Sequence, residues 1–363
     1  MNAITHTHFD QAKCEAFTGK MVTALNHAAL MLMTSVGHRT GLFDTFARPP
    51  STTSEGLAAA AGLSERYVRE WLAVMVTSGV VEYDPLARTY SLPAEHAAVL
   101  TREAEFNLAV PSQFIATAAG VEDRIVERFR DGGGLQYHHC GRFYTVMAED
   151  SQQSVVNALF DHILPLVPGL TDKLERGIEV ADVGCGAGRA LFKLARRFPN
   201  SRFIGFDLCA DAFEDTANQA VELGLNNLNF KACDLTEAGH LGLFDLVLAF
   251  DAIHDQKDPA GVLKSVRRSL HPAGTFLMQD IGGSSYLENN INNPFAPMLY
   301  MMSTTHCTPV SLGQGGAGLG TMWGVELAER MLKEAGFNRI QMSRLAHDPV
   351  NAYFVCRPDP ERA

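Results

Sequence analysis

Residues 180–189 read Val-Ala-Asp-Val-Gly-Cys-Gly-Ala-Gly-Arg, a short apolar run that breaks into three alternating glycines. The run 178–183 predicts a buried strand and the apolar spacing of 190–198 predicts a helix, so the glycines fall in a strand-to-helix turn. Glycine allows positive φ and leaves no Cβ between backbone and ligand, and the following helix presents free N–H groups. The stretch therefore predicts a nucleotide-type cofactor site at Gly184, Gly186 and Gly188.

The spacing of these glycines separates one class of cofactor from another. Dinucleotide-binding proteins carry G-x-G-x-x-G, whereas here the third glycine comes one residue early and Arg189 stands where that motif has glycine. About 20 residues further on, the apolar run 202–207 ends in Asp207, where an acid is expected to bind ribose hydroxyls. G-x-G-x-G within D-V-G-C-G-A-G resembles the motif of class I S-adenosylmethionine (SAM) methyltransferases. From this motif alone, two other interpretations stay open: a tight turn that binds no ligand, and a site for another nucleotide.

Strand and helix patterns alternate regularly after residue 178. This alternation predicts an α/β, Rossmann-like fold with a parallel sheet covered on both faces and ligands at the carboxyl ends of the strands. Amphipathic helices are expected at 189–198, 211–223, 259–270 and 325–335. The seven expected strands are 178–183, 202–207, 228–231, 244–250, 273–280, 338–344 and 352–357.

Several polar residues fall at the carboxyl ends of these strands. Asp207 can bind both ribose hydroxyls; the alternative is that it caps the next helix. Asp234 follows the third expected strand and is placed to accept a hydrogen bond from an adenine amino group, while Leu235 covers the ring. The predicted cofactor site also includes Leu208 and Phe250.

The most informative polar cluster follows the fourth expected strand, where the chain reads Phe250-Asp-Ala-Ile-His254-Asp255. His254 should lie on the substrate side of the pocket. A histidine has a reference pKa of about 6.5, so it suits the removal of a proton from a hydroxyl or thiol. The alternative is that His254 only caps the following helix. We predict that His254 and Asp255 are the catalytic residues.

The amino-terminal third predicts a winged helix. Helical patterns at 57–61 and 65–78 are followed by a hairpin pattern, 80–83 with 89–92. A winged helix suggests DNA binding, but the arginines of the second helix are matched by glutamates, and a DNA reader needs a basic face. An earlier helical stretch, 16–46, is apolar on several faces, which indicates either an internal core contact or a homodimer interface.

Composition limits the partners and the compartment. The chain has 363 residues, 46% of them hydrophobic, and a net charge of -11, which argues against nucleic acid or an anionic membrane as the main partner. Its seven cysteines are scattered without a C-x-x-C pair, which favours a reducing cytoplasm and no metal site. Neither a signal peptide nor a membrane span is expected. We expect domains at 1–105, 106–175 and 176–363: a winged-helix domain for dimerisation and as a substrate lid, a helical connector, and a SAM-binding catalytic domain.

Residues 178–357 as a whole resemble a class I SAM methyltransferase. A winged helix, a helical connector and then this sheet resemble the small-molecule O-methyltransferases. The resemblance implies that His254 and Asp255 match the family's histidine-aspartate motif, with the histidine as general base. It also implies that Phe143 and Met147 form an F-x-x-x-M element, in which Met147 contacts the cofactor and Phe143 the substrate.

A closer resemblance is to bacterial winged-helix methyltransferases, often without an assigned substrate, through L-G-T-M-W-G at 319–324. Plant-type relatives orient the histidine with a glutamate shortly before the last helix, and this stretch has none. The acid that orients His254 is therefore unidentified. Asp255 is expected to be a poor substitute, because neighbours in sequence seldom face each other on a helical turn.

The long segment 282–324 predicts a cover over the substrate. His306 and Trp323 are its expected substrate-binding residues, although its many methionines could equally fill a core. The expected reaction moves a methyl group from SAM to the oxygen or the sulfur of a small-molecule acceptor. Two alternatives stay open: a SAM-responsive winged-helix transcriptional regulator, and a reaction on this fold that does not transfer a methyl group.

Overall fold

The computed structural model describes residues 9–358 of the chain. Contacts between Cα atoms divide it into two compact units, Met1–Ala116 and Thr117–Ala363. The expected three-part division into 1–105, 106–175 and 176–363 stays a prediction. Within residues 9–358, no helix is both long enough and apolar enough to cross a membrane.

The first unit contains the predicted winged helix. The helix Glu65–Thr77 buries Trp71, Leu72 and Met75 in a cluster with Phe43 and Phe46. The Phe43 and Trp71 rings meet edge to face. Its elements are α1 (Gln11–Arg39), α2 (Leu42–Phe46), α3 (Ser54–Ala61), α4 (Glu65–Thr77), β1 (Glu82–Asp84), β2 (Thr89–Ser91) and α5 (Ala94–Leu100).

The charges of α4 do not form the basic face that DNA binding requires. Arg66 pairs with Glu70, and the Arg69 guanidinium lies 2.6 Å from the Glu65 carboxylate. Both pairs lie within one helix, so neither arginine presents an uncompensated charge. The expected absence of nucleic acid stays a prediction.

The second unit is built on a seven-stranded sheet with the order β5-β4-β3-β6-β7-β9-β8. The α/β fold with seven strands is therefore confirmed. The strands are β3 (Glu179–Val183), β4 (Arg202–Asp207), β5 (Leu228–Ala232), β6 (Phe244–Phe250), β7 (Leu270–Ile281), β8 (Arg339–Leu345) and β9 (Asp348–Arg357). β3 lies parallel to β4 and to β6, and Val180, Ala181 and Val183 are fully buried.

The expectation of an entirely parallel sheet is wrong at one edge. β9 runs antiparallel to both β7 and β8. The reason is the connection between β8 and β9, where Leu345 pairs with Asp348 across a two-residue turn. A turn this short forms a hairpin, because a parallel neighbour requires a long crossover.

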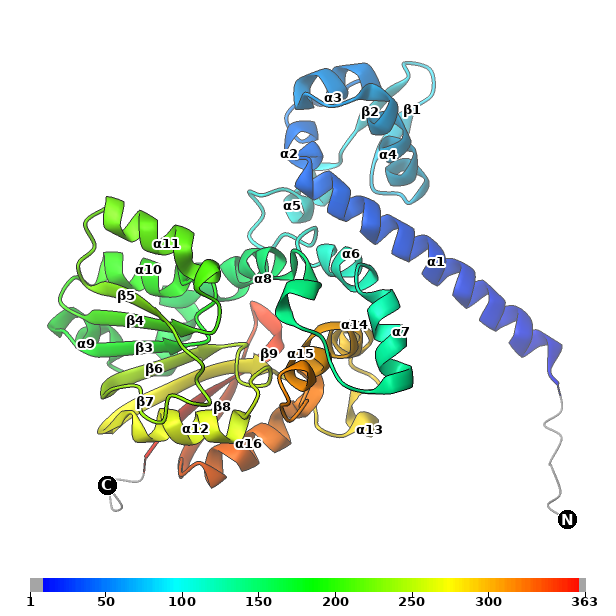
Figure 1. The fold of residues 1–363 in the computed structure, drawn as a ribbon. Helices are drawn as coiled ribbons and strands as arrows, with labels where there is room; N and C mark the ends of the chain where they lie inside the picture. Colours follow the sequence, from blue (N-terminus) through cyan, green and yellow to red (C-terminus); the bar gives the residue numbers. More distant parts are fainter. Residues whose placement is uncertain (1–8, 359–363) are drawn as a thin grey trace, which may run out of the picture. The chain divides into compact units, whose positions relative to one another are not determined.

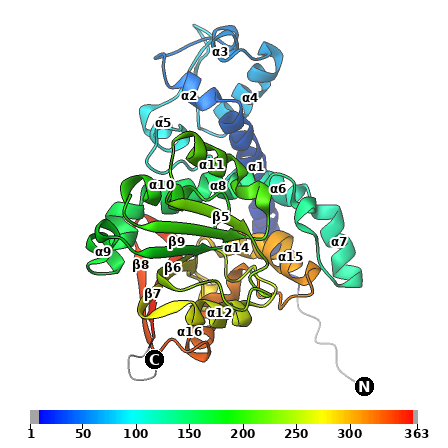
Figure 2. The same cartoon turned by 60° about the vertical axis from the view of Figure 1, so that its left-hand side comes forward.

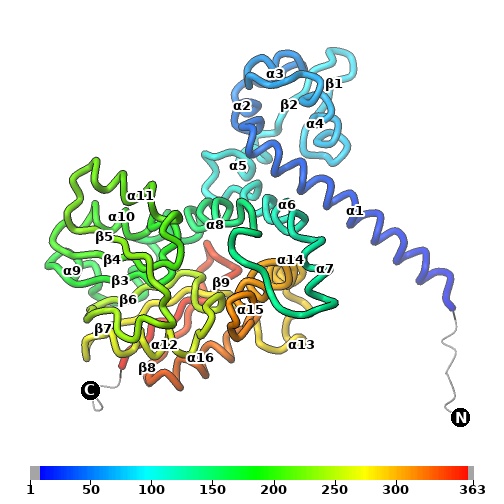
Figure 3. The backbone as a smooth tube through the Cα atoms, in the orientation of Figure 1, coloured from blue at the N-terminus to red at the C-terminus, as the bar shows by residue number. Residues whose placement is uncertain are grey.

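Helices cover both faces of this sheet. α10 (Arg189–Arg197) and α11 (Ala210–Glu222) lie on one face, and α12 (Pro259–Arg268) and α16 (Gly324–Glu334) lie on the other (Figure 1, Figure 2). The segment 282–324 folds as α13 (Leu287–Asn290), α14 (Ala296–Met302) and α15 (Thr308–Gly313), close to α7 (Figure 3). The remaining helices are α6 (Gln113–Ala119), α7 (Glu122–Asp131), α8 (Phe143–Ser151) and α9 (Leu170–Arg176).

Candidate active site

The glycine turn joins β3 to α10 as predicted, and its backbone is fixed from the neighbouring strand. The N–H groups of Gly184 and Cys185 both donate to the carbonyl of Phe206, at 2.8 and 3.0 Å. A Cβ on Gly188 would lie 2.3 Å from the Phe230 ring, and this glycine has φ +68°. A side chain at this position would therefore both strain the backbone and clash.

Asp207 ends β4 and ties the turn to the next helix. Its Oδ2 accepts from the N–H of Gly186 at 2.8 Å, and its Oδ1 accepts from the N–H of Cys209 at 3.0 Å. Burial raises the pKa of this carboxyl above its usual value, against the hydrogen bonds that lower it. Cys209 is the N-cap residue of α11, which has no side-chain cap, so Asp207 does not cap this helix. The same carboxylate still lines the pocket.

Asp234 and Leu235 lie beyond the end of β5. The Asp234 Oδ1 accepts from the N–H and the hydroxyl of Thr236, at 2.9 and 2.6 Å. Leu235 is buried, and both residues line the same pocket as Asp207. The Asp234 carboxylate is thus held within its own loop.

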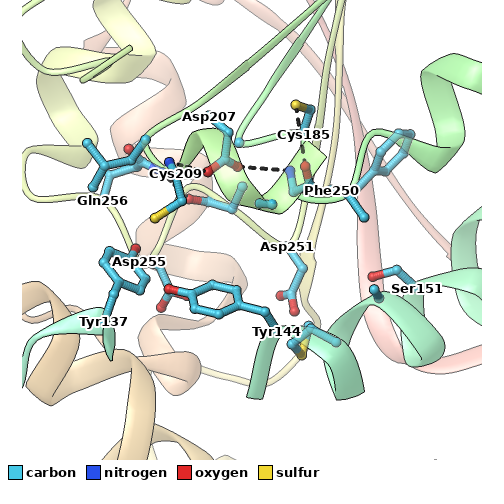
Figure 4. Close-up of a pocket in the computed structure, with 18 of the residues that line it drawn as sticks. Tyr137, Tyr144, Ser151, Cys185, Asp207, Cys209, Phe250, Asp251, Asp255 and Gln256 are labelled. Atoms are coloured by element: carbon cyan, nitrogen blue, oxygen red, sulfur yellow. Dashed lines mark hydrogen bonds between the residues drawn. The ribbon is translucent and has the colours of Figure 1, made fainter. Parts of the chain in front are cut away.

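These residues border one cavity of about 440 Å³ within the second unit. This volume is in the range of small-molecule sites. The Asp207 and Asp251 carboxylates face the space between the strand ends and helix α8, which carries Tyr144 and Ser151 (Figure 4). Of the predicted site residues, the cavity is lined by Gly184, Gly186, Gly188, Asp207, Leu208, Asp234, Leu235, Phe250, Met147, Phe143, His254, Asp255 and His306.

The acid that orients His254 is Asp280, near the end of β7. His254 Nδ1 lies 2.8 Å from the Asp280 Oδ1, and both side chains are almost completely buried. The same oxygen accepts from the Trp323 indole N–H at 2.9 Å. Sequence reasoning missed Asp280, although a signal existed: it is an acid near the end of a strand, like Asp207.

Trp323 is therefore placed differently from the expectation. It is not among the residues that line the cavity, and its indole N–H points at Asp280. This contact holds the Asp280 carboxylate, and Asp280 holds the His254 ring. Trp323 thus positions the site rather than forming its wall.

Asp255 lies closer to His254 than expected. Its Oδ1 is 3.2 Å from the His254 Nε2, so the reasoning that these two neighbours would not face each other is wrong, although the acid that orients the ring through Nδ1 is Asp280. The expectation assumed a helical turn, whereas residues 254–255 form a non-helical turn and α12 begins only at Pro259. The N-terminal cap of α12 is Asp258, which accepts from the Gly261 N–H, and this removes the helix-cap alternative for His254.

The two carboxylates control the charge of His254. Burial by itself would lower the pKa of His254, but the negative charges of Asp280 and Asp255 raise it well above its usual value. In return, and against the effect of burial, His254 lowers the pKa of Asp255 to about 2. The site therefore holds a buried charge network with one histidine between two carboxylates.

His306 and Phe143 form one wall of the cavity. Their rings stack with centroids 3.5 Å apart and an interplanar angle of 17°. Burial lowers the pKa of His306 to about 4, so the ring is neutral at pH 7. Within residues 9–358, its Nδ1 has no hydrogen-bond partner. This wall offers an aromatic face and an uncharged polar atom to a ligand.

Two groups of side chains in this network could also hold a metal ion. In each group the nitrogen, oxygen and sulfur atoms lie within 4.8 Å of one another. The first group is His254, Asp255 and Cys307, and the second is Asp251, His254 and Asp280. The expected absence of a metal stays a prediction.

Both parts of the chain match protein-family models. Residues 28–102 match the Rv2258c-like winged HTH domain, and residues 174–336 match a methyltransferase domain. The chain is a winged-helix protein with a class I SAM methyltransferase domain. This confirms the family and the fold expected from the glycine turn.

Individual relatives match over limited lengths. Nocamycin O-methyltransferase of Saccharothrix syringae is 33% identical over 100 residues, 27% of this chain and 36% of that protein. The first three curated relatives are matched over only 5%, 37% and 36% of their own lengths.

Solved structures match over nearly the whole chain. The human N-acetylserotonin methyltransferase in complex with SAM has a TM-score of 0.67 and 16% identity, and covers 98% of this chain and 99% of its own. Mitomycin 7-O-methyltransferase has a TM-score of 0.65 and 16% identity, and the match covers 96% of this chain and 100% of its own. At such identities the likeness shows the fold. The SAM complex is in accord with the expected cofactor.

Proposed function

We propose that this protein is a SAM-dependent methyltransferase that acts on the oxygen of a small molecule. The observation that carries the proposal is the His254–Asp280 pair, in which His254 lines the same cavity as the glycine turn. This juxtaposition brings a proton-accepting group and a nucleotide-type site together. Sulfur, as in a small thiol or sulfide, is the second candidate acceptor atom.

The residues present fit the cofactor. Gly186 borders open space, since a Cβ there would meet no protein atom within 4 Å, and the buried Asp207 carboxylate would take the ribose hydroxyls. Asp234 would take the adenine amino group beside Leu235. When bound, SAM supplies a methyl group that is already electrophilic, so no protein nucleophile is required.

The chain's own residues align the acceptor and remove its proton. His254 takes the proton of the acceptor hydroxyl on Nε2, which lies 3.2 Å from the Asp255 Oδ1, while Asp280 holds the Nδ1 hydrogen. The charged ring then lies between the two carboxylates. Phe143 and His306 stack beside the acceptor and keep water away. Alignment can lower a barrier by roughly 7 to 11 kcal/mol, and a positioned base adds about 10² to 10⁴ in rate.

The proposal is tested by measuring S-adenosylhomocysteine (SAH) formed from SAM with a panel of acceptors. The panel contains phenols, aliphatic alcohols, small thiols and sulfide. We expect SAH with at least one hydroxyl compound, because the chain is similar to nocamycin O-methyltransferase and mitomycin 7-O-methyltransferase. SAH only with thiols would move the assignment to sulfur, which needs less help because a free thiol has a pKa of about 8.5. No SAH with any acceptor would refute the proposal.

Turnover should increase from neutral to alkaline pH. The raised pKa of His254 keeps this ring protonated near neutrality, so the fraction able to accept a proton grows as the pH rises. Asp255→Asn removes one negative charge that raises the pKa of His254. The increase of kcat with pH should therefore occur at lower pH in this variant. The measurement is kcat from about pH 6 to about pH 10 for both proteins. The same pH dependence of kcat in both proteins would show that Asp255 does not control the charge of His254.

The role of the first unit is also proposed. Phe17, Met21, Val22 and Leu25 on α1 are exposed, and an apolar face of this kind favours a homodimer. Light scattering should then give twice the chain mass of 39.5 kDa, whereas the single-chain mass would contradict the dimer. A cytoplasmic location is proposed from the free cysteines, which a thiol titration on the protein freshly taken from cells would test.

A further inference from the structure

The acceptor end of the cavity, which is the part around His254, has a surplus of negative charge. Among the described residues, the whole cavity wall contains seven aspartates but only two arginine or lysine side chains, Arg189 and Lys257. The His254 Nδ1 lies 2.8 Å from an oxygen of Asp280, and its Nε2 lies 3.2 Å from an oxygen of Asp255. One positive ring between two carboxylates leaves one negative charge uncompensated.

The two basic side chains are engaged at the cofactor end. Arg189 begins α10 directly after the glycine turn, and its guanidinium donates to a backbone carbonyl of α8 at 3.0 Å. Lys257 acts on Asp234, where hydrogen bonds from Thr236 and then the Lys257 charge lower the carboxyl pKa. An anionic group bound at the acceptor end would therefore find neither of these cations free to pair with it.

The negative charge of Asp255 acts on the side chains around it. Burial and then Asp255 raise the pKa of Tyr137, Cys140 and Cys307 above their usual values. Tyr137 lies beside Asp255 (Figure 4), and the Cys307 sulfur lies within 4.8 Å of a His254 nitrogen and an Asp255 oxygen. These groups stay uncharged at neutral pH because their anionic forms are disfavoured. An anionic group of a ligand would meet the same unfavourable surroundings.

Aromatic rings line the acceptor end. Besides the stack of Phe143 on His306, the Tyr144 ring meets His306 edge to face with centroids 6.4 Å apart, and the Tyr137 and Tyr144 centroids are 5.5 Å apart. Rings of this kind stack on a flat aromatic ligand, and their faces also attract cations. The acceptor end therefore combines aromatic faces with a net negative charge.

We propose that the acceptor is an aromatic compound that carries no anionic group, and that a positively charged substituent is accepted as well as an uncharged one. This assignment rests on the proposed function. An uncharged acceptor adds no charge to the site, and an ammonium group is attracted by Asp255 and by the aromatic faces. A carboxylate or phosphate would be buried near Asp255 without a partner, which is unfavourable. The acceptor end thus selects its substrate by repulsion.

Three probes with the same dihydroxyphenyl ring and different side-chain charges test this selection. At neutral pH, 4-ethylcatechol is uncharged, dopamine carries an ammonium group and 3,4-dihydroxyphenylacetate carries a carboxylate. The measurement is kcat/KM from SAH formation, and a probe that is not methylated is measured as an inhibitor of the acceptor that the panel identifies. We expect the uncharged and cationic probes to be used or bound at least about tenfold better than the anionic probe, from one like-charge repulsion.

Two variants change the charge of the acceptor end. Gln314 lines the cavity and its side chain hydrogen-bonds Tyr137, so Gln314→Lys introduces a positive charge there. Asp255→Asn removes the negative charge. Each variant should raise the preference for the anionic over the uncharged probe by about tenfold. Because this preference is a ratio measured on one preparation, a general loss of activity or of folded protein cancels.

Gln219→Lys is the matched control, because Gln219 is exposed on α11 and the substitution changes the net charge as Gln314→Lys does. This control should keep the wild-type ratio. The proposal is overturned if the wild type uses or binds the anionic probe as well as the uncharged one. It is also overturned if the uncharged and cationic probes have no effect, or if the ratio is unchanged in both variants. Failure of the proposed function would look different, because no acceptor of the panel would give SAH.

Discussion

Replacing Asp207 by alanine is expected to reduce SAM affinity by about 100-fold or more. The carboxylate would bind two ribose hydroxyls, and each hydrogen bond to a charged group contributes about 1.5 to 3 kcal/mol. The same oxygens accept from the N–H groups of Gly186 and Cys209, so the glycine turn also loses its support. Isothermal calorimetry with SAM and with SAH measures the loss.

The control for this prediction is Asp172→Ala, which removes an exposed carboxylate in the first turn of α9. This variant has the same change in net charge as Asp207→Ala and should bind SAM like the wild type. If Asp207→Ala kept the wild-type affinity, the ribose would not lie at the end of β4. The orientation of the cofactor along the strand ends would then have to be abandoned.

Replacing His254 by alanine is expected to lower kcat by about 10² to 10⁴, with SAM affinity within a few-fold of the wild type. The ring is on the acceptor side of the cavity, bonded to Asp280 and next to Asp255, and it makes no contact with Asp207 or the glycine turn that the structure records. Its loss therefore removes the proton acceptor without removing the cofactor site. Single-turnover kinetics and calorimetry on the same preparation separate the two effects.

Asp280→Asn is the companion variant for this prediction. It keeps a hydrogen-bond acceptor for Nδ1 of His254 and removes the charge, so kcat should fall less than in His254→Ala. Removing this charge should also shift the pH profile of kcat to lower pH, because Asp280 raises the pKa of His254. A His254→Ala variant with wild-type kcat at every pH would exclude His254 as the base.

Features that depend on neighbours in sequence could be predicted. The glycine turn, Asp207 and the strand ends follow from local apolar runs and from the spacing of a few residues. The error about Asp255 came from the same local reasoning, because it assumed a helix where the chain makes a turn before α12. The antiparallel β9 was missed because the last expected strand began at 352, too late to show the two-residue turn that joins β8 to β9 at Asp348.

The sequence by itself determined the end of the cavity at the glycine turn, because one strand, one turn and one helix form it within a short stretch. The end of the cavity around His254 was decided by the tertiary structure. Asp280 lies 26 residues from His254, and Trp323 lies 43 residues from Asp280. The stack of Phe143 on His306 joins α8 to the segment 282–324. Only the folded sheet and its cover bring these side chains together, since no local spacing encodes contacts over such distances.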